Sequence, residues 1–389
     1  MRVNPDTDKG QVPNMETVKI DPDEIQVGQQ LPWPVYDQKG RLLLQKGERI
    51  VSQSQLNALQ ERGLYREVAG VRERGAGSQQ CADASPFELV AEYAHRYQVL
   101  AKAVFEGKEG TAGRLARLVE DIRGLKAVDA DAVIGGLHLF RFTHGTFRHD
   151  LRQVYMAFLA DFLADQAGIA ETQRGSVTGA ALTANVAMGD QADALQMQRE
   201  SLTRDQQQLI ARHPEQAADL LRRVGVDDPL WLRMVEEHHE RPDGDGYPKK
   251  RSAAQIAFET RIVTLAEAYT AMVLPRGGRN ILAPQEALRE VLLVRGKQFD
   301  EALVALLVRS FGIYPPGVLV KLSNGETAVV VRRGQDPKLP QLCSVINARG
   351  QPILRPVRRD PSAEQSRLVG FAGEVKQFPV NVLVLWGYA

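Results

Sequence analysis

Two adjacent histidines stand in the segment EEHHERPDGDGYPKK, residues 236–250. Neutral imidazole is a good ligand for first-row divalent metals, and His238 and His239 offer two such rings. Neighbouring side chains on a helix point about 100° apart, so both rings reach one metal only where the helix ends. Pro242 and the glycines after it supply such an end. The segment therefore predicts a metal site at a helix terminus.

The loop that follows the histidines is rich in turn-forming residues. It contains Asp243, Gly244, Gly246, Tyr247 and Pro248. Glycines permit positive φ and proline fixes the exit of the chain, so a tight turn is predicted. A turn does not exclude a second role in recognition.

The stretch HHERPDGDGYP resembles the signature of HD-GYP domains, a subgroup of the HD phosphohydrolase superfamily. The resemblance runs from about residue 130 to 311. It includes IARHPEQAADLL around His213, TRIVTLAEAYTAM around Glu267 and GKQFDEALVALL near its end. It implies an all-helical bundle. Active members of the family hydrolyse cyclic di-GMP with two or three metals, usually iron or manganese.

The resemblance implies five metal ligands in this chain. They are His149, His213, His238, His239 and Glu267. Glu267 stands where the family usually has an aspartate, so it keeps an oxygen donor on a longer arm. The loop 243–248 matches the segment that names the family, which lies beside the nucleotide and also touches partner proteins.

The HD pair itself is missing from the matching position. The family's LLHDIGK motif aligns with LTANVAM, residues 182–188. Ala184 then replaces the histidine, Asn185 the aspartate and Met188 the lysine. We therefore expect no complete catalytic set.

A literal His-Asp pair occurs elsewhere, at His149 and Asp150. In the same alignment His149 takes the first-ligand position and Asp150 is an ordinary neighbour. The family's optional glutamate for a third metal falls on Gly145.

These replacements weaken a two-metal mechanism, which needs a bridging anionic oxygen and an activated water. Asn185 is neutral and Ala184 donates nothing, so one metal position keeps at most His149 and Glu267. The other position could retain three histidines, which are His213, His238 and His239. We expect at most one divalent metal there (iron, manganese or zinc) and no full two-metal centre. Packed remnants of a dead site are the open alternative.

Two functions follow from the resemblance. The first is a cyclic di-GMP signalling protein with a degenerate, non-catalytic HD-GYP domain that binds the nucleotide or a partner, such as a diguanylate cyclase or effector protein. The alternative is an active or weakly active metal-dependent cyclic di-GMP phosphodiesterase that uses the remaining histidines.

A third interpretation places function near the C-terminus. The segments VRRGQDPK and RPVRRDP contain five arginines, which are Arg332, Arg333, Arg355, Arg358 and Arg359. Paired arginines can hold phosphate through two hydrogen bonds. A solvated basic surface is the plainer alternative.

The pattern of apolar residues predicts a multi-domain α+β protein. Alternation around DQKG predicts a hairpin, and SQSQLNALQERG predicts a short helix. Helical periodicity dominates from Pro86 to Phe311, with a stripe in HDLRQVYMAFLADFLADQAG. Asn324-Gly325 then predicts a second hairpin, and CSVINARGQPILRP and NVLVLWGYA are further candidate strands.

The predicted domains are a disordered tail, a small α+β domain, a linker, a helical connector, a degenerate HD-GYP helical domain and a small β-rich domain. Their ranges are 1–17, 18–69, 70–85, 86–129, 130–314 and 315–389.

Composition bounds the partners and the compartment. The chain has 389 residues, 49 basic and 48 acidic side chains and a net charge of +1, so it is not expected to coat DNA. Its two cysteines form no CxxC motif. Residues 1–17 are polar, and no apolar run is long enough to span a membrane. A cytoplasmic protein is predicted, and a homodimer is left open.

Overall fold

The computed structural model describes residues 84–388, apart from 144–147, 190, 199, 276–280, 374 and 376–380. Before residue 84 it describes short segments only, at 17–19, 35–37, 42–44, 48, 50, 53, 56–57 and 65–67. The chain divides into two compact units, Met1–Ala84 and Ser85–Ala389.

The first unit contains a small antiparallel sheet. Its strands are β1 (Thr17–Lys19), β2 (Val35–Tyr36), β3 (Leu42–Leu44) and β4 (Tyr65–Glu67), in the order β1-β4-β2-β3. β2 pairs with β3, which confirms the hairpin predicted around DQKG. Gln53, Leu56 and Asn57 are helical, as predicted. The predicted tail up to residue 16 and the predicted linker from 70 to 83 lie outside the described residues.

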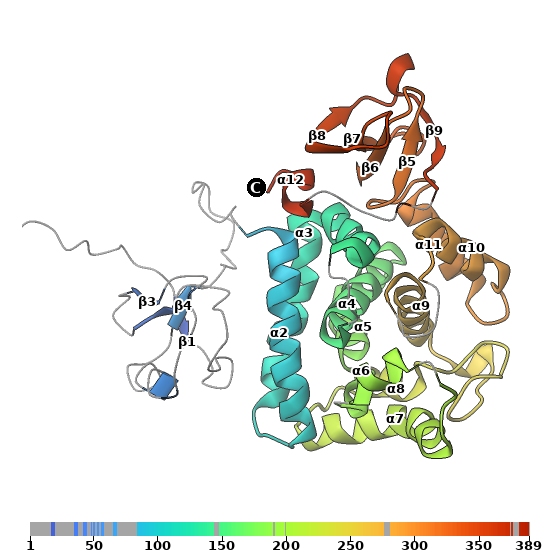
Figure 1. The fold of residues 1–389 in the computed structure, drawn as a ribbon. Coiled ribbons are helices and arrows are strands. Elements are labelled where there is room, and N and C mark those ends of the chain that lie inside the picture. The colour runs from blue at the N-terminus through green and yellow to red at the C-terminus, as the bar shows by residue number, and fades with distance from the viewer. Residues whose placement is uncertain are drawn as a thin grey trace, which may run out of the picture. The chain divides into compact units, whose positions relative to one another are not determined.

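The second unit begins with a bundle of helices (Figure 1). They are α2 (Pro86–Phe105), α3 (Thr111–Thr143), α4 (His149–Gln166), α5 (Glu171–Thr183), α6 (Gln191–Met197), α7 (Arg204–Arg223), α8 (Pro229–Glu237), α9 (Phe258–Val273), α10 (Pro284–Leu293) and α11 (Glu301–Phe311). Short 3₁₀ turns η2 (Val186–Met188) and η3 (Ala253–Gln255) lie between them. The predicted all-helical bundle is confirmed.

Helix α4 is the central element of this bundle. Every residue from Asp150 to Ala164 is buried, because α2, α3, α5, α9 and α11 all pack against α4. The sequence predicted a buried stripe on one face, and those residues are indeed buried. The structure adds that the opposite face is buried too, which is the signature of a helix inside a core. Polar side chains on α4 therefore face protein rather than water.

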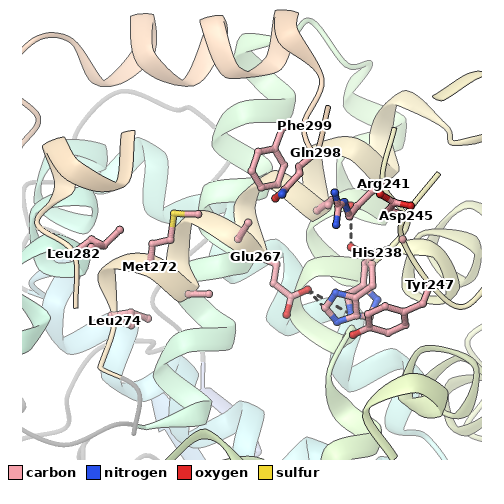
Figure 2. Close-up of a pocket in the computed structure, with 15 residues that line it drawn as sticks. His238, Arg241, Asp245, Tyr247, Glu267, Met272, Leu274, Leu282, Gln298 and Phe299 are labelled. Carbon is pink, nitrogen blue, oxygen red and sulfur yellow. Dashed lines mark hydrogen bonds and ion pairs between the residues drawn. The ribbon is translucent and has the colours of Figure 1, made fainter. Parts of the chain in front are cut away.

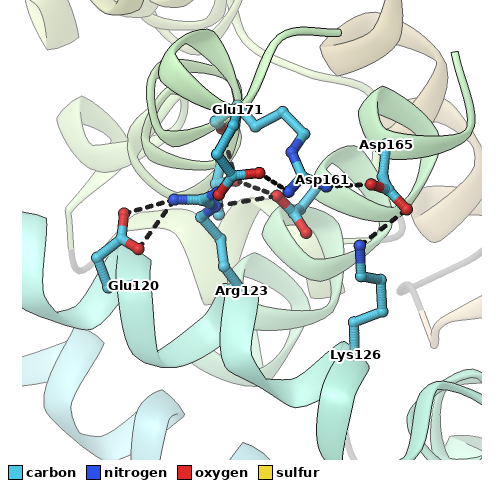
Figure 3. A network of polar contacts seen from close by, with 8 residues as sticks. Glu120, Arg123, Lys126, Asp161, Asp165 and Glu171 are labelled. Carbon is cyan, nitrogen blue, oxygen red and sulfur yellow. Dashed lines mark hydrogen bonds and ion pairs between the residues drawn. The ribbon is translucent and has the colours of Figure 1, made fainter. Parts of the chain in front are cut away.

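Ion pairs join α3, α4 and α5 on one side of the bundle (Figure 3). Arg123 of α3 donates to the buried Asp161 of α4 at 3.3 Å and also pairs with Glu171. Lys126 lies 2.8 Å from Asp165, which also pairs with Arg174. The network joins α3, α4 and α5 to one another.

Helix α3 is interrupted at Asp129, where the backbone is extended (φ −168°, ψ 91°). The Asp129 carboxylate accepts hydrogen bonds from the Ala132 amide at 3.0 Å, the Tyr388 hydroxyl at 2.9 Å and the Arg332 guanidinium. It thus caps the second half of α3 and ties it to the C-terminal part of the chain.

The C-terminal part forms a five-stranded antiparallel sheet. Its strands are β5 (Leu319–Leu322), β6 (Thr327–Arg332), β7 (Gln341–Ile346), β8 (Pro352–Arg359) and β9 (Leu368–Phe371), in the order β8-β7-β6-β5-β9. The pairing of β5 with β6 confirms the hairpin at Asn324-Gly325. The strands predicted in CSVINARGQPILRP are also confirmed, as β7 and β8.

The strand predicted in NVLVLWGYA is wrong, because this segment forms helix α12 (Val382–Trp386). The Asn381 side chain accepts from the Leu383 amide at 2.8 Å, and Gly387 ends the helix with φ +84°. Trp386 packs so closely on Gly135 of α3 that no side chain would fit there. Capping and a tertiary contact override an apolar pattern that fits either structure.

One buried histidine links the bundle to the sheet. His138 of α3 donates from Nδ1 to the Pro316 carbonyl at 2.6 Å and accepts at Nε2 from the Tyr269 hydroxyl at 2.9 Å. Burial lowers the pKa of His138 to about 4. Among the parts of the chain that the structure describes, every helix is too short or too polar to span a bilayer.

Candidate metal centre

Helix α8 delivers the two adjacent histidines. Asp228 caps its N-terminus by accepting from the Leu230 and Trp231 amides. The Trp231 ring lies on Gly179 of α5, and its Nε1 donates to Thr183 at 2.9 Å. The helix ends at Glu237, so the two histidines stand at its terminus, as predicted.

Helix α7 supplies the third histidine through a local device. Pro214 has no N–H, so the Ile210 carbonyl loses its usual helical partner. The Nδ1 of His213 instead donates a hydrogen bond to that carbonyl oxygen at 2.7 Å. In the same way, the Nδ1 of His238 donates to the Val235 carbonyl at 2.6 Å, near the end of α8.

These bonds determine which nitrogen faces inward. With Nδ1 protonated on both rings, the two Nε2 atoms present lone pairs, and they lie 3.2 Å apart. Two facing lone pairs repel unless a cation or a shared proton lies between them. The potential ligand atoms of His213, His238 and His239 all lie within 4.8 Å of one another. This donor set fits a divalent metal bound by three histidines.

The protonation states agree with this interpretation. Burial lowers the pKa of His213 to about 4, with a further contribution from His238. Burial also lowers the pKa of His239 well below its ordinary value. Both rings are therefore neutral at pH 7, which is the form that binds metal.

Glu267 lies beside the histidines on α9 and is 7% exposed. Its Oε1 accepts from Arg152 Nη2 at 3.2 Å and from Asn185 Nδ2 at 3.3 Å. Its Oε2 lies 3.4 Å from His238 Nε2 and 3.8 Å from His239 Nε2. Burial opposes ionisation of Glu267, but the histidines and Arg152 outweigh it and hold its pKa below the usual range. The carboxylate is therefore charged at neutral pH.

The buried side chain of Glu240 stabilises the turn after the histidines. Glu240 accepts from the Lys249 amide at 2.6 Å and the Arg251 amide at 2.7 Å. A side chain at Gly246 would collide with the backbone of 239–241, so this close approach requires glycine. The Tyr247 ring then stacks on His239, with centroids 4.6 Å apart. The predicted turn is present and covers one histidine.

A cavity of about 520 Å³ opens in front of the histidines. Figure 2 shows His238, Tyr247 and Arg241 near one end and Met272, Leu274 and Leu282 near the other. Its remaining lining residues are His239, Asp245, Gly246, Thr264, Glu267, Ala268, Ala271, Gln298 and Phe299. The cavity thus combines a polar end with an apolar end, as small-molecule sites do.

The remaining predicted site residues lie around this centre. Ala184 and Asn185 follow the end of α5, and Ala184 is fully buried. Met188 is buried in η2. His149 begins α4, with its ring centroid 6.2 Å from that of Tyr97, and it lies outside the three-histidine cluster. Gly145 is outside the described residues.

Sequence reasoning missed two residues of the centre. Arg152 is one turn after His149 on α4 and is only 1% exposed, although arginine is rarely buried. The three-residue spacing from His149 was an available signal, since it places both on one helix face. Glu240 carried no signal of its own, because its role depends on the folded loop.

The C-terminal arginines are largely used inside the protein. Arg332 pairs with Asp129, Arg333 with Asp131, and Arg359 with Glu326. Arg355 and Arg358 are exposed. Three of the five thus serve internal ion pairs, which favours an architectural role over phosphate binding.

Comparison with known proteins identifies the helical region. Residues 142–303 match the HD domain family. The cyclic di-GMP phosphodiesterase PA4108 of Pseudomonas aeruginosa is 32% identical over 166 residues, which cover 42% of this chain and 40% of that protein. The cyclic di-GMP phosphodiesterase response regulator RpfG of Xanthomonas campestris pv. campestris is 30% identical over 159 residues, 40% of this chain and 41% of that protein.

A solved structure described as Bd1817, a HDG"Y"P protein from Bdellovibrio bacteriovorus, aligns with 76% of this chain and 98% of its own, at 16% identity and a TM-score of 0.48. The chain spans less than half the length of the two curated relatives above. The matched residues 142–303 contain the paired histidines and the Gly-Tyr-Pro turn. Residues 142–303 are therefore an HD domain of the HD-GYP class.

Proposed function

We propose that this chain is a cyclic di-GMP signalling protein whose HD-GYP domain binds the nucleotide without hydrolysing it at an appreciable rate. The observation that carries the proposal is Asn185. Its amide nitrogen donates to Glu267, at the position where the family has a metal-bridging carboxylate. A donor N–H cannot bridge two metals.

The neighbouring residues remove further parts of the mechanism. Ala184 offers no ligand atom, and Met188 offers no positive charge for a phosphate. A change in a group that only orients a ligand costs about 10- to 100-fold in metal affinity or activity. Loss of two direct ligands should cost more. Nucleotide binding can survive this loss, because Ala184 and Asn185 do not line the cavity.

The cavity favours a nucleotide as ligand. Its volume of about 520 Å³ lies within the usual range of roughly 300 to 1,000 Å³ for small-molecule sites. Tyr247 and Phe299 offer aromatic faces for a base, while Arg241, which pairs with Asp243, is the cation that lies nearest to a bound phosphate. The named relatives are cyclic di-GMP phosphodiesterases, which points to that dinucleotide.

Calorimetric titration with cyclic di-GMP tests binding, and chromatography of the products under iron or manganese tests hydrolysis. We expect saturable binding by the wild type, a loss of at least about tenfold in affinity in Tyr247→Ala, and no linear dinucleotide or GMP. Arg355→Ala, outside the cavity, serves as the control. Absence of binding to the wild type would refute the proposal.

A restored variant tests the cause of the lost hydrolysis. Ala184→His with Asn185→Asp supplies the missing pair, and adding Glu267→Asp restores the usual third residue. We expect the triple variant to turn over cyclic di-GMP at least about tenfold faster than the wild type. Equal rates would show that other features prevent hydrolysis.

The alternative is a phosphodiesterase that works with one metal. The three-histidine cluster favours it, because a metal there would supply a Lewis acid next to the cavity. Metal-dependent turnover by the wild type that disappears in His238→Ala would establish this function over the first.

Partner binding is the other route by which a non-catalytic domain can signal. A diguanylate cyclase or effector that contacts the 243–248 loop stays our predicted partner class, and the domain boundaries at 86, 130 and 315 stay predictions. A pull-down of such partners with the wild type and with Tyr247→Ala tests this contact, and the variant should retain less partner.

A further inference from the structure

We propose that Asp245 and Gln298 read the base of a bound cyclic dinucleotide and select guanine over adenine. This deepens the proposed function and rests on it, because it requires that the cavity binds a nucleotide. The two side chains come from different loops, 241–248 and 294–300, and both line the cavity of about 520 Å³. Neither residue is a predicted metal ligand, and neither belongs to the cluster of three histidines.

The two loops are joined through their backbones. The Asp243 amide donates to the Lys297 carbonyl at 3.0 Å, which holds the residues next to this bond close together. Asp245 lies two residues after Asp243, and its own amide donates to the Asp243 carboxylate at 3.1 Å. Gln298 directly follows Lys297, and its amide donates to the Val294 carbonyl at 3.0 Å. The bond therefore brings Asp245 and Gln298 to the same part of the cavity (Figure 2).

The polar side chains in this part of the cavity differ in their partners. Arg241 forms an ion pair with Asp243. The carboxylate of Asp245 and the carboxamide of Gln298, in contrast, have no hydrogen-bond or ion-pair partner among the described residues. Asp245 is exposed and Gln298 is half-buried. Both groups can therefore bind a ligand without breaking a contact inside the protein.

The Watson–Crick edge of guanine fits these two groups. It presents two adjacent donors, N1–H and the N2 amino group, beside the O6 acceptor. The carboxylate of Asp245 is an acceptor with two oxygens, so it can accept from both donors at once. The carboxamide of Gln298 can donate to O6 through its NH₂ group. Adenine has a lone pair at N1 instead of a hydrogen, and that lone pair repels a carboxylate.

Phe299 offers a surface against which the same base can lie. It directly follows Gln298, lines the cavity and is 7% exposed. Hydrogen bonds hold its loop on both sides of Gln298. The Gly296 amide donates to the Phe299 carbonyl at 2.8 Å, and Asp300 caps α11 by accepting from the Ala302 amide at 3.0 Å. Binding of a base therefore costs little ordering of this loop, which favours affinity.

Calorimetric titration of the full-length protein with cyclic di-GMP and with cyclic di-AMP tests the selection of the base. The two ligands share the sugar–phosphate ring and differ only in their bases. We expect the wild type to bind cyclic di-GMP at least about tenfold more tightly, because adenine leaves the carboxylate without its two hydrogen bonds. The ratio of the two affinities is the quantity that base recognition sets.

Asp245→Asn is the first variant, since it keeps the size of the side chain and removes the charge. It should weaken the binding of cyclic di-GMP by about 10- to 100-fold and leave cyclic di-AMP at or above its wild-type affinity. Asp219→Asn is the matched control, because Asp219 is an exposed acid on α7 that pairs with Arg222 and does not line the cavity. Both of its affinities should stay within about threefold of the wild type.

Gln298→Ala is the second variant, and it removes an uncharged donor. It should weaken the binding of cyclic di-GMP by about threefold to tenfold, with a smaller effect on cyclic di-AMP. The loss should be smaller than in Asp245→Asn, because hydrogen bonds to a charged group are the stronger ones.

Each outcome bears on a definite part of the proposal. An unchanged ratio of affinities in Asp245→Asn or Gln298→Ala, including an equal loss of both affinities, would remove that residue from base recognition. Equal affinity of the wild type for the two nucleotides would overturn base selection and leave the proposed function intact. Absence of binding to both nucleotides would refute the proposed function and the base recognition together.

Discussion

The two sides of the candidate metal centre have different chemistry. On one side, α7 and α8 present the Nε2 atoms of His213 and His238, which lie 3.2 Å apart, with His239 beside them. On the other side, α4 and α5 present the guanidinium of Arg152 and the carboxamide of Asn185. The three histidines of the first side offer nitrogen donors to a cation. The second side carries its own.

This difference shows that histidines of one predicted ligand set need not meet in one cluster. His149 belongs to the second side by its place on α4, and it lies outside the cluster of potential ligand atoms. A cation already stands one turn away on the same helix. The two sides therefore differ in the positive charge that Arg152 places on Glu267, and not in the number of histidines alone.

The largest expected effect comes from removing the internal cation. Without metal, Arg152→Met leaves the Glu267 carboxylate buried without its guanidinium, which should lower the free energy of unfolding by about 3 to 5 kcal/mol. Urea unfolding in the presence of a chelator measures this. Arg152→Met combined with Glu267→Gln should lose clearly less than the single variant. An equal loss would mean that Arg152 contributes packing rather than charge.

A smaller effect is expected from His238→Ala on the first side. The variant loses a direct ligand, so Co²⁺ affinity should fall by more than about 100-fold, while the metal-free protein keeps its helical circular dichroism. Competition with a chromophoric chelator measures the affinity. Retention of wild-type affinity would show that the metal, if bound, lies elsewhere.

A smaller, pH-dependent effect on stability is expected from His138, whose two ring nitrogens both have protein partners. Its pKa is lowered to about 4 by burial, whereas in the unfolded chain it binds a proton below about 6.5. The unfolded state therefore holds more protons between these values, and stability should fall as pH drops from 6.5 to 4, on the order of 2 kcal/mol. Urea unfolding across this range should show a shallower fall in His138→Gln. An unchanged slope would contradict the assignment.

The smallest effect is expected from His149→Ala. Because His149 lies outside the three-histidine cluster, Co²⁺ affinity should change by less than about threefold. The same chelator competition measures it beside His238→Ala. A loss of affinity as large as that of His238→Ala would show that His149 binds the same metal as the three histidines.

Much of the fold was predictable because local patterns and tertiary structure agree. The Asn324-Gly325 turn and its alternating flanks gave a hairpin, and the apolar periodicity of α4 gave a buried helix. NVLVLWGYA shows the limit. A short apolar run fits either a strand or a helix, and contact between Trp386 and Gly135 accompanies the helix.

The sequence by itself determined the types of donor atom and the terminus at which two of them stand. His238-His239 before Pro242 required a helix end, and His213-Pro214 freed a carbonyl for the ring. Only the tertiary structure decided which groups meet. Arg152 and Asn185 are separated in the chain from Glu267 by 115 and 82 residues, yet both bind its Oε1. Such contacts depend on how α4, α5 and α9 pack, which no local pattern specifies.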